Sequence, residues 1–381
     1  MCEVEFVAKT NVSNLALQRT SIARPYLSKA LFERLCVLGT EADAARQFPT
    51  ASFAALADHG LLERFALLGS VNSEVGSEDD LFDWLRFMGR ADLSLGRLYE
   101  GHVNAIKLID WFGTAEQKRQ MHANLANGKV YGVWATEPVP GVALVESGAE
   151  RVLTGGKSFA SGAGHIDFAI VTAQPASGPR RLVVVPANDS DRADVSGWTV
   201  RGMRATMSGS YDLTDLPIAT NDLLGSPGVY DGEPRFTAGA WRFTAVQLGG
   251  IEALVAETRA AMSDAARNDP LQRLKFAEAV EAMRSAHFWV QKSAEMFEAQ
   301  HADAPAFVRM TRGVVERAAL EVMTLAARIV GTRSAFDGQR IDKITRDLSL
   351  YLRQGGPDHA RDQAAIAWLD HDIWDEDDRV W

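Results

Sequence analysis

The stretch from Tyr131 to Ala173 constrains the fold most, because its short apolar runs alternate with polar residues as they do in β-strands. Glycines at positions 141, 155, 156, 162 and 164 interrupt these runs, which is typical of strands joined by turns. The regions on both sides instead repeat apolar residues every three or four positions, which is the period of an amphipathic helix. The sequence therefore predicts a β domain placed between two helical regions.

The region before Tyr131 contains two clear helical signals. One helix is predicted from Asp79 to Gly89, where apolar residues recur on one face. Another is predicted to begin after Thr114, because Thr114 and Gln117 have the spacing of a capping box, in which each side chain bonds the other residue's backbone N–H. These signals concern structure alone.

Helical spacing returns after Arg235. Two apolar stripes, around Val290 and around Val322, each need helical partners to bury them, so an antiparallel bundle is predicted. His287 lies inside the first stripe and is interpreted as a core residue rather than a ligand. Residues 370–381 are rich in acids but have no framing turn, so we interpret them as a solvated tail and predict no metal site.

Composition argues against several classes of function. A net charge of −10 leaves no excess of cations with which to bind phosphates, so no nucleic-acid partner is expected. Two cysteines are too few for a disulfide framework and fit a reducing compartment. No stretch approaches the roughly 18 apolar residues that a membrane span needs. With no signal peptide recognised at the N-terminus, a cytoplasmic location is expected.

Three motifs follow one another along the middle of the chain: ATEP at 135–138, GKSFASGAGHID at 156–167 and GMRAT at 202–206. Their sequence and order resemble the acyl-CoA dehydrogenase superfamily of flavoproteins, and the chain is identified as a divergent member. The resemblance implies an N-terminal α-helical domain over residues 1–127, a middle antiparallel β-barrel or sandwich domain over 128–232, and a C-terminal four-helix bundle with the acidic tail over 233–381.

By the same resemblance, the first two motifs form the bed of a flavin ring. The family places the equivalents of Ala135 and Thr136 at the edge of the ring, an aromatic residue at the position of Phe159, and a hydroxyl at the position of Ser161. The resemblance implies FAD as the cofactor. FMN stays an alternative, because residues that contact phosphates in the family are replaced here.

A second group of cofactor residues is implied in the C-terminal region. In the family, a glycine-rich segment after a bundle helix reaches the cofactor of a neighbouring subunit, so a homo-oligomer, dimer or tetramer, is implied. The aligned segment here reads RIVGTRSA, whose arginines could bind phosphate instead. The candidate residues of this group are Arg267, Gln272, Arg328, Gly331 and Arg333.

The family's catalytic base has no counterpart in this sequence. The segment RDLSLYLRQGGP aligns without a gap on the family's base motif, and Gly355 stands where the glutamate should be. The other position at which relatives place a base holds Trp241 and Arg242. His359 and His102 are the candidate replacements, because imidazole exchanges protons near neutral pH. Both also have a structural interpretation, His359 as an exposed residue of a helix start and His102 as a core or surface histidine.

Three functions remain open. The first is a flavin-dependent oxidoreductase of acyl-CoA dehydrogenase type, which passes hydride from a small-molecule or carrier-bound substrate to flavin N5 and hands electrons to a transfer partner. The second is a flavin-dependent monooxygenase fed by a separate flavin reductase, because FASG at 159–162 is similar to the segment in such enzymes. The third is a non-catalytic binding subunit that keeps the fold.

Overall fold

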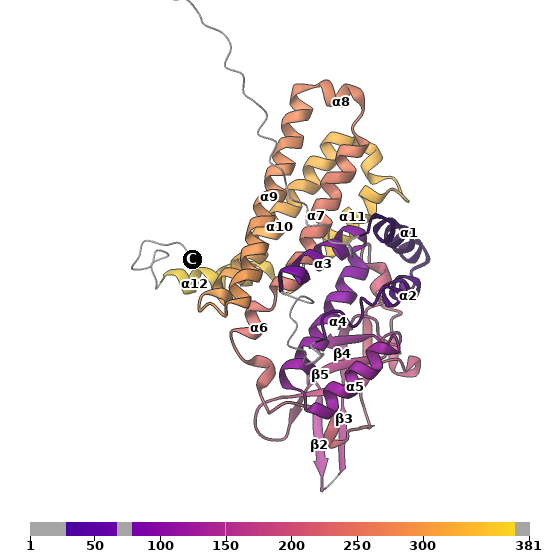
Figure 1. Ribbon diagram of the computed structural model, residues 1–381, viewed down its shortest axis with the longest axis vertical. Helices are drawn as coiled ribbons and strands as arrows, with labels where there is room; N and C mark the ends of the chain where they lie inside the picture. The colour runs from indigo at the N-terminus through magenta and orange to yellow at the C-terminus, as the bar shows by residue number, and fades with distance from the viewer. Residues whose placement is uncertain (1–27, 67–77, 149, 370–381) are drawn as a thin grey trace, which may run out of the picture.

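The structure is a computed structural model that describes residues 28–66, 78–148 and 150–369, and only the backbone of residues 78–80. Figure 1 shows the long helices α7, α9 and α10 in the upper part of the molecule and the strands below them. No helix in these described ranges is long and apolar enough to cross a membrane.

Five described helices precede the sheets, and α4 is the central one. It is buried along almost its whole length and packs against both β1 and the bundle helix α7. Asp92 caps its start by accepting a hydrogen bond of 2.8 Å from the N–H of Leu95. The capping box of Thr114 and Gln117 is present at the start of α5, and the helix predicted from residue 79 is α3, so both predictions are confirmed. The five are α1 (Lys29–Ala45), α2 (Thr50–Asp58), α3 (Glu78–Ala91), α4 (Leu93–Phe112) and α5 (Ala115–Ala126).

The middle of the chain forms two sheets. The larger has seven strands in the order β10-β6-β5-β2-β3-β9, with β1 pairing to β5, and the smaller has the order β4-β8-β7. The strands are β1 (Tyr131–Trp134), β2 (Ala143–Ser147), β3 (Glu150–Thr154), β4 (Gly156–Ala160), β5 (Phe168–Pro175), β6 (Arg181–Pro186), β7 (Ala193–Asp194), β8 (Gly209–Asp212), β9 (Leu216–Pro217) and β10 (Leu223–Leu224).

Most strand pairs are antiparallel, as predicted, but β5 runs parallel to both β1 and β2. Other strands lie between the members of each parallel pair along the chain, which is consistent with the long connection that parallel strands need. The sequence showed where strands lie but not which of them would pair.

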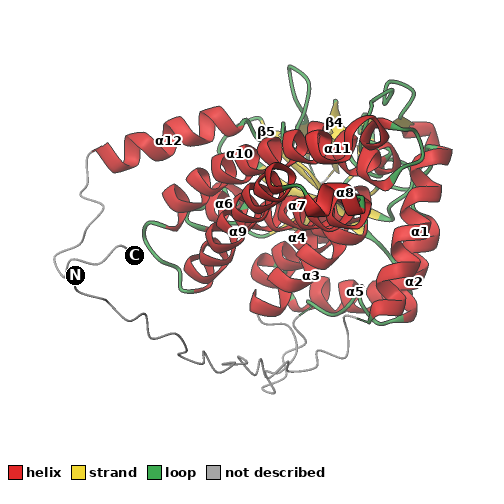
Figure 2. Ribbon diagram, turned by 90° about the horizontal axis from the view of Figure 1, so that it is seen from above, coloured by secondary structure: helices red, strands yellow, loops and turns green. Residues whose placement is uncertain are grey.

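The C-terminal region is a helical bundle. Helices α7, α9 and α10 pack on one another, α11 packs on α7, and α12 packs on α10 and projects away from the rest (Figure 2). His287 on α9 is partly buried beside Glu252, with Nδ1 at 3.4 Å from the carboxylate. The helices are α6 (Arg235–Ala238), α7 (Trp241–Ala261), α8 (Asp264–Asn268), α9 (Pro270–Glu298), α10 (Ala304–Val330), α11 (Arg340–Tyr351) and α12 (Pro357–Leu369), with a short 3-10 helix η5 (Gly331–Ala335) after α10.

Candidate functional site

Two cavities adjoin each other between the sheets and the helices. The first, called here the aromatic cavity, has a volume of about 270 Å3 and carries most of the cleft's aromatic side chains. The second, the hydroxyl cavity, has a volume of about 430 Å3 and is lined by several hydroxyl groups. We call the two together the cleft, because both are lined by Arg97, Thr136, Phe159 and Gln354.

The four residues predicted to form the flavin bed all line this cleft. Ala135 borders the aromatic cavity, Ser161 borders the hydroxyl cavity, and Thr136 and Phe159 border both. Segments that are more than twenty residues apart in the sequence are therefore brought together as the resemblance implied.

A buried ion pair fastens the turn at 135–138 to strand β4. Lys157 is fully buried, and its Nζ donates to the carboxylate of Glu137 and, at 2.9 Å, to the hydroxyl of Thr172. Burial lowers the pKa of Lys157, and the contact with Glu137 opposes this shift. The N–H of Ser158 also donates to the carbonyl of Thr136 at 3.0 Å. These contacts hold Thr136 beside β4, and sequence reasoning missed the pair because it assigned the two motifs separately.

Phe159 is presented to the cleft by an unusual backbone. Its φ is +52°, a left-handed conformation that is uncommon for a residue with a side chain. The register of β4 against β8 shifts between Lys157 and Ala160, so Phe159 lies in an irregularity of the strand pair. As a result its ring is 68% exposed at the cleft instead of packed in the core. Strained backbone of this kind is often found at functional sites.

A chain of hydroxyl groups runs from the third motif to Ser161. Thr206 Oγ1 lies 2.9 Å from Ser208 Oγ, and the Ser208 hydroxyl donates to Ser161 Oγ at 3.0 Å. The indole N–H of Trp134 donates to the Ser161 carbonyl at 3.0 Å. Because Ser161 Oγ accepts from Ser208, its own proton is left for a partner in the cleft.

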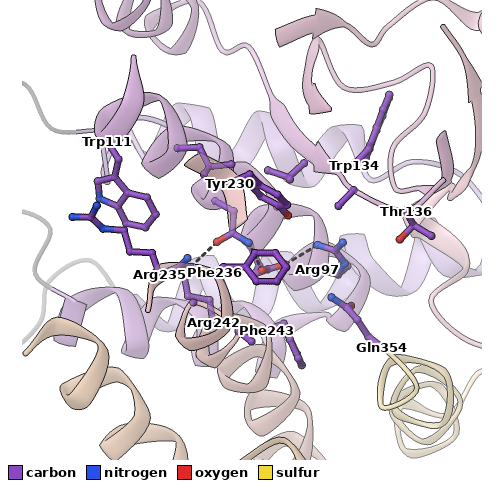
Figure 3. A pocket seen from close by; sticks show the side chains of 18 of the residues that line it. Arg97, Trp111, Trp134, Thr136, Tyr230, Arg235, Phe236, Arg242, Phe243 and Gln354 are labelled. Carbon is purple, nitrogen blue, oxygen red and sulfur yellow. Dashed lines mark hydrogen bonds and ion pairs between the residues drawn. The ribbon is translucent and has the colours of Figure 1, made fainter. Parts of the chain in front are cut away.

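The aromatic cavity contains a small polar network from α4 and α7. Arg97 pairs with Glu100 at 2.6 Å, Asn104 donates to the other oxygen of Glu100, and Arg242 Nε donates to Asn104 at 2.6 Å. Figure 3 shows Arg97 and Arg242 on this network, with Tyr230 and Phe236 close by. Among the described residues that line the cleft, Glu100 is the only carboxylate, and its two oxygens are engaged by these partners.

Gly355, which the motif resemblance aligns with the family's glutamate, lines the hydroxyl cavity. Its φ is +71°, and a Cβ atom built on it would lie 2.1 Å from Arg312 Nη2. The guanidinium of Arg312, on α10, lies 5.4 Å from the centre of the Phe243 ring, and Nη2 donates to the carbonyl of Gln354 at 3.5 Å. A cation, the guanidinium of Arg312, therefore lies next to the residue that is aligned with the family's catalytic glutamate.

His102, a predicted catalytic residue, lies in the core and does not line the cleft. Its Nε2 is 2.8 Å from the carbonyl of Leu62, and its Nδ1 accepts from the N–H of Tyr131 at 3.0 Å, which assigns the neutral tautomer protonated on Nε2. Burial lowers its pKa to about 4, although the bond to Leu62 opposes the shift. Its neighbour Gly101 lines the aromatic cavity instead. The structure thus corrects the expectation of His102 in a substrate cavity and supports the core interpretation.

His359, the other catalytic candidate, is exposed in the first turn of α12 and is not among the residues that line the cleft. The alternative position for a base also offers none. Trp241 is fully buried, and Arg242, which lines the aromatic cavity, carries a cation. A catalytic role for His359 stays a prediction.

The second group of predicted cofactor residues lies at the end of the bundle that carries α8, far above the sheets in Figure 1. Two of the arginines in this group donate hydrogen bonds to backbone carbonyls of the same chain. Arg267 donates to the carbonyls of Met262, at 3.1 Å, and Arg259, and Arg333 donates to the carbonyl of Ala261 at 3.1 Å. Gln272 is in the first turn of α9, and Arg328 and Gly331 are at the end of α10. This group and the cleft residues are separated within one chain.

Comparison with known proteins agrees with this architecture. Residues 228–363 match the family model of the acyl-CoA dehydrogenase C-terminal domain. The crystal structure of FMN-bound TdsC from Paenibacillus sp. A11-2 superposes with a TM-score of 0.79 at 20% identity, covering 91% of this chain and 96% of that one. Butyryl-CoA dehydrogenase from Megasphaera elsdenii superposes with a TM-score of 0.78 at 17% identity, covering 92% and 98%. The chain has the acyl-CoA dehydrogenase fold, as its motifs predicted.

Several curated proteins are similar in sequence to this chain, including the following two. A dibenzothiophene monooxygenase of Rhodococcus erythropolis is 28% identical over 163 residues, and this match spans 38% of either chain. A probable FMNH2-dependent monooxygenase, SfnC of Pseudomonas putida, is 21% identical over 350 residues, which cover 84% of this chain and 88% of the relative. Both relatives are named as monooxygenases, and SfnC is named as a probable FMNH2-dependent one.

Proposed function

We propose that the protein is a flavin-dependent monooxygenase that takes reduced FMN from a separate flavin reductase. The observation that carries this proposal is Gly355, where a glycine backed by the cation of Arg312 stands in place of the base that a dehydrogenase needs. The monooxygenases among the relatives support the same conclusion. The dehydrogenase function, which was the first of the three functions expected from the sequence, has less support than the monooxygenase function.

The residues of the cleft fit a flavin ring. Phe159 offers an aromatic face, Thr136 and Ser161 offer hydroxyl groups, and Lys157 with Glu137 keeps these segments in register. Reduced flavin, when bound there, would supply the electrons with which dioxygen is activated for transfer of one oxygen atom. The role of the chain is then to place the ring, to offer the Ser161 proton, and to exclude water with aromatic walls.

FMN is proposed in preference to FAD. Arg267 and Arg333 are two of the five residues implied to contact the cofactor of a neighbouring subunit, and both guanidinium groups already donate to carbonyls of their own chain. The relative named for FMNH2 and the FMN-bound TdsC structure support the smaller cofactor.

The substrate is proposed to lie in the aromatic cavity. Its walls include Trp111, Tyr230, Phe236 and Phe243, which together favour a compact apolar body. Glu100 is held by Arg97 and Asn104 and is therefore poorly placed to remove a proton from a carbon atom. The residues of this cavity would therefore bind and orient the substrate.

A homo-oligomer is proposed as well. Leu271 and Leu274, in the first turns of α9, are 67% and 57% exposed, next to Gln272 of the second cofactor group. Apolar side chains grouped in this way are typical of protein interfaces. Light scattering that found a monodisperse monomer would contradict this proposal.

Three assays on the purified protein would distinguish the three functions. In the first, a flavin reductase with NADH supplies reduced FMN, and transfer of label from 18O2 to dibenzothiophene and to smaller thioethers is followed by mass spectrometry. In the second, butyryl-CoA is added without oxygen to the flavin-loaded protein and bleaching of the flavin is followed. In the third, binding of FMN and FAD is measured by quenching of flavin fluorescence.

We expect FMN binding and labelled product, with no bleaching by butyryl-CoA. Ser161→Ala should lower the yield of labelled product relative to hydrogen peroxide, because the hydroxyl that faces the ring is lost. Bleaching by the thioester would support the dehydrogenase function. A protein that binds neither flavin would refute both enzymatic functions and favour a binding subunit.

A further inference from the structure

Arg312 is a half-buried cation that no carboxylate of the described residues neutralises. Its Nε is buried without a hydrogen-bond partner, and its Nη2 makes only a long bond of 3.5 Å to the carbonyl of Gln354. Burial, followed by the nearby charge of Arg309, lowers the pKa of Arg312. Buried polar groups are normally paired, so an incompletely paired guanidinium calls for an explanation.

The guanidinium lies directly behind two residues of the cleft wall and is not itself one of the residues that line the cleft. It is packed against the ring of Phe243, which lines the aromatic cavity, and touches Gly355, which lines the hydroxyl cavity. A side chain at residue 355 would collide with it, so the glycine makes room for the cation. Arginine is suited to this position because its planar fork binds the two oxygens of an anion at once.

The rest of the cleft also carries more positive than negative charge. Arg97 and Glu100 neutralise each other, whereas Arg235 and Arg353 line the cleft without a carboxylate partner among the described residues. In addition, the hydroxyl of Tyr351 is buried at the hydroxyl cavity and has no hydrogen-bond partner. A phenol hydroxyl and a guanidinium both donate hydrogen bonds, so each would be satisfied by an acceptor, and the cation favours an acceptor with negative charge.

We propose that Arg312 binds the charged group of the substrate, and that the substrate is a compact organic anion, a carboxylate or a sulfonate on an apolar body. The anion lies where dehydrogenases of this fold keep their glutamate, and the apolar body lies against the aromatic walls. The assignment of this anion as a substrate rests on the proposed function, but its binding can be measured without any reaction.

The experiment is calorimetric titration of the whole chain, with and without saturating oxidised FMN. The probes are benzoate, benzenesulfonate and the neutral benzamide, which has the size of benzoate. The variants are Arg312→Gln, Arg312→Lys and, as a matched control, Arg317→Gln, an exposed arginine on the same helix. Because neither oxygen nor reduced flavin is present, a failure of the monooxygenase proposal would leave this test intact.

We expect one of the anions to bind the wild-type protein more tightly than benzamide. Arg312→Gln should weaken its binding by about tenfold to a hundredfold, which is the usual effect of losing a hydrogen-bonded charge. Arg312→Lys should recover part of the loss, and Arg317→Gln should have no effect. Benzamide should bind equally well to all variants. Circular dichroism on heating checks that each variant is folded.

A second pair of variants tests the same contact by changing Gly355 instead of Arg312. Gly355→Glu places a carboxylate against Arg312, and Gly355→Ala introduces the same backbone strain without the charge. We expect Gly355→Glu to lower anion affinity much more than Gly355→Ala does. Equal effects of the two would contradict the proposal.

The phosphate of FMN has the same chemistry as the proposed anion, and the titration separates the two. If Arg312→Gln weakened binding of FMN but not of riboflavin, the cation would serve the cofactor and the substrate assignment would be wrong. The proposal is also overturned if neither anion binds the wild-type protein, or if Arg312→Gln binds them as well as the wild type does.

Discussion

The chain contains two groups of buried or half-buried polar side chains that are built differently. One is the α11 junction, where Lys343 and Arg346 meet four carboxylates. Lys343 donates to Asp92 and, at 2.7 Å, to Asp347. Arg346 donates to two carboxylates and a carbonyl. The carboxylates of the junction are those of Asp43, Asp92, Asp342 and Asp347.

The other group is at the cleft, where Tyr351 lines the hydroxyl cavity and Arg312 lies behind Gly355. Neither the guanidinium Nε nor the phenol hydroxyl has a hydrogen-bond partner within the described structure. At the junction, burial opposes the charge of Lys343, but the carboxylates of Asp347 and Asp92 outweigh it and raise its pKa. At Arg312, burial and a like charge both lower the pKa.

The comparison separates a structural role from a binding role. A cation buried together with carboxylates holds segments in place, and here it joins α11 to the start of α4 and to the loop at Met203, whose N–H donates to Asp347 at 2.5 Å. A cation buried without a carboxylate stays poorly satisfied until a ligand arrives. Substitution of a cation that is buried with carboxylates should therefore lower stability. Substitution of a cation that is buried without a carboxylate should weaken ligand binding.

The largest effect is expected from Lys343→Met. The change removes the cation between Asp92 and Asp347, whose side chains are 2% and 1% exposed, and leaves two like charges buried together. Breaking a buried pair in this way typically costs about 3–5 kcal/mol. Urea unfolding at pH 7 should therefore show a large loss in the free energy of unfolding.

The matched control is Arg119→Met, which breaks the exposed pair of Arg119 and Glu116 on α5. Exposed pairs contribute at most about 1 kcal/mol, so its effect should be small. If the two variants were equally stable, the junction would not have the structural role assigned to it.

An intermediate effect is expected from the pH dependence that His102 produces. Its pKa is about 4 when folded and near 6.5 when unfolded, so between these values the unfolded chain binds the proton more readily. Stability from this residue is complete above about pH 6.5 and is lost as the pH falls towards 4. At pH 4.5 the loss should be about 2–3 kcal/mol.

The measurement is urea unfolding of the wild type and of His102→Gln at pH 7.5 and pH 4.5. Other ionisable groups also make stability depend on pH, so the quantity of interest is the difference between the two proteins. We expect the variant to be less stable at pH 7.5 and to lose less on acidification. Parallel curves would show that His102 does not contribute to acid sensitivity.

The flavin bed could be predicted from the sequence because its residues belong to short motifs with fixed spacing. Thr136, Phe159 and Ser161 were found in this way, and the structure brings them together in one cleft. His102 was offered as a catalytic candidate because it follows Gly101, and the alternative interpretation as a core residue is the one that the structure supports. Successive residues of a helix differ by about 100° in direction, so Gly101 faces the cavity and His102 faces the core.

Other features could not be predicted, because they depend on contacts between distant segments. Arg312 meets Gly355 only through the packing of the bundle, and nothing near Arg312 in the sequence indicates this contact. The loss of the glutamate was visible in the alignment with the family motif. Its replacement by a cation from another helix was not.

The smallest effect is expected from Tyr351→Phe, which tests the cleft side of the comparison. The hydroxyl is buried and has no partner, and burial raises its pKa well above the usual value, so it stays protonated. Removing a buried donor that makes no hydrogen bond should leave the free energy of unfolding unchanged or slightly higher. Affinity for benzoate should nevertheless fall by about threefold to tenfold if the hydroxyl donates to the bound anion. A variant that lost stability without losing affinity would place Tyr351 with the α11 junction, and the division between the two groups would then need to be redrawn.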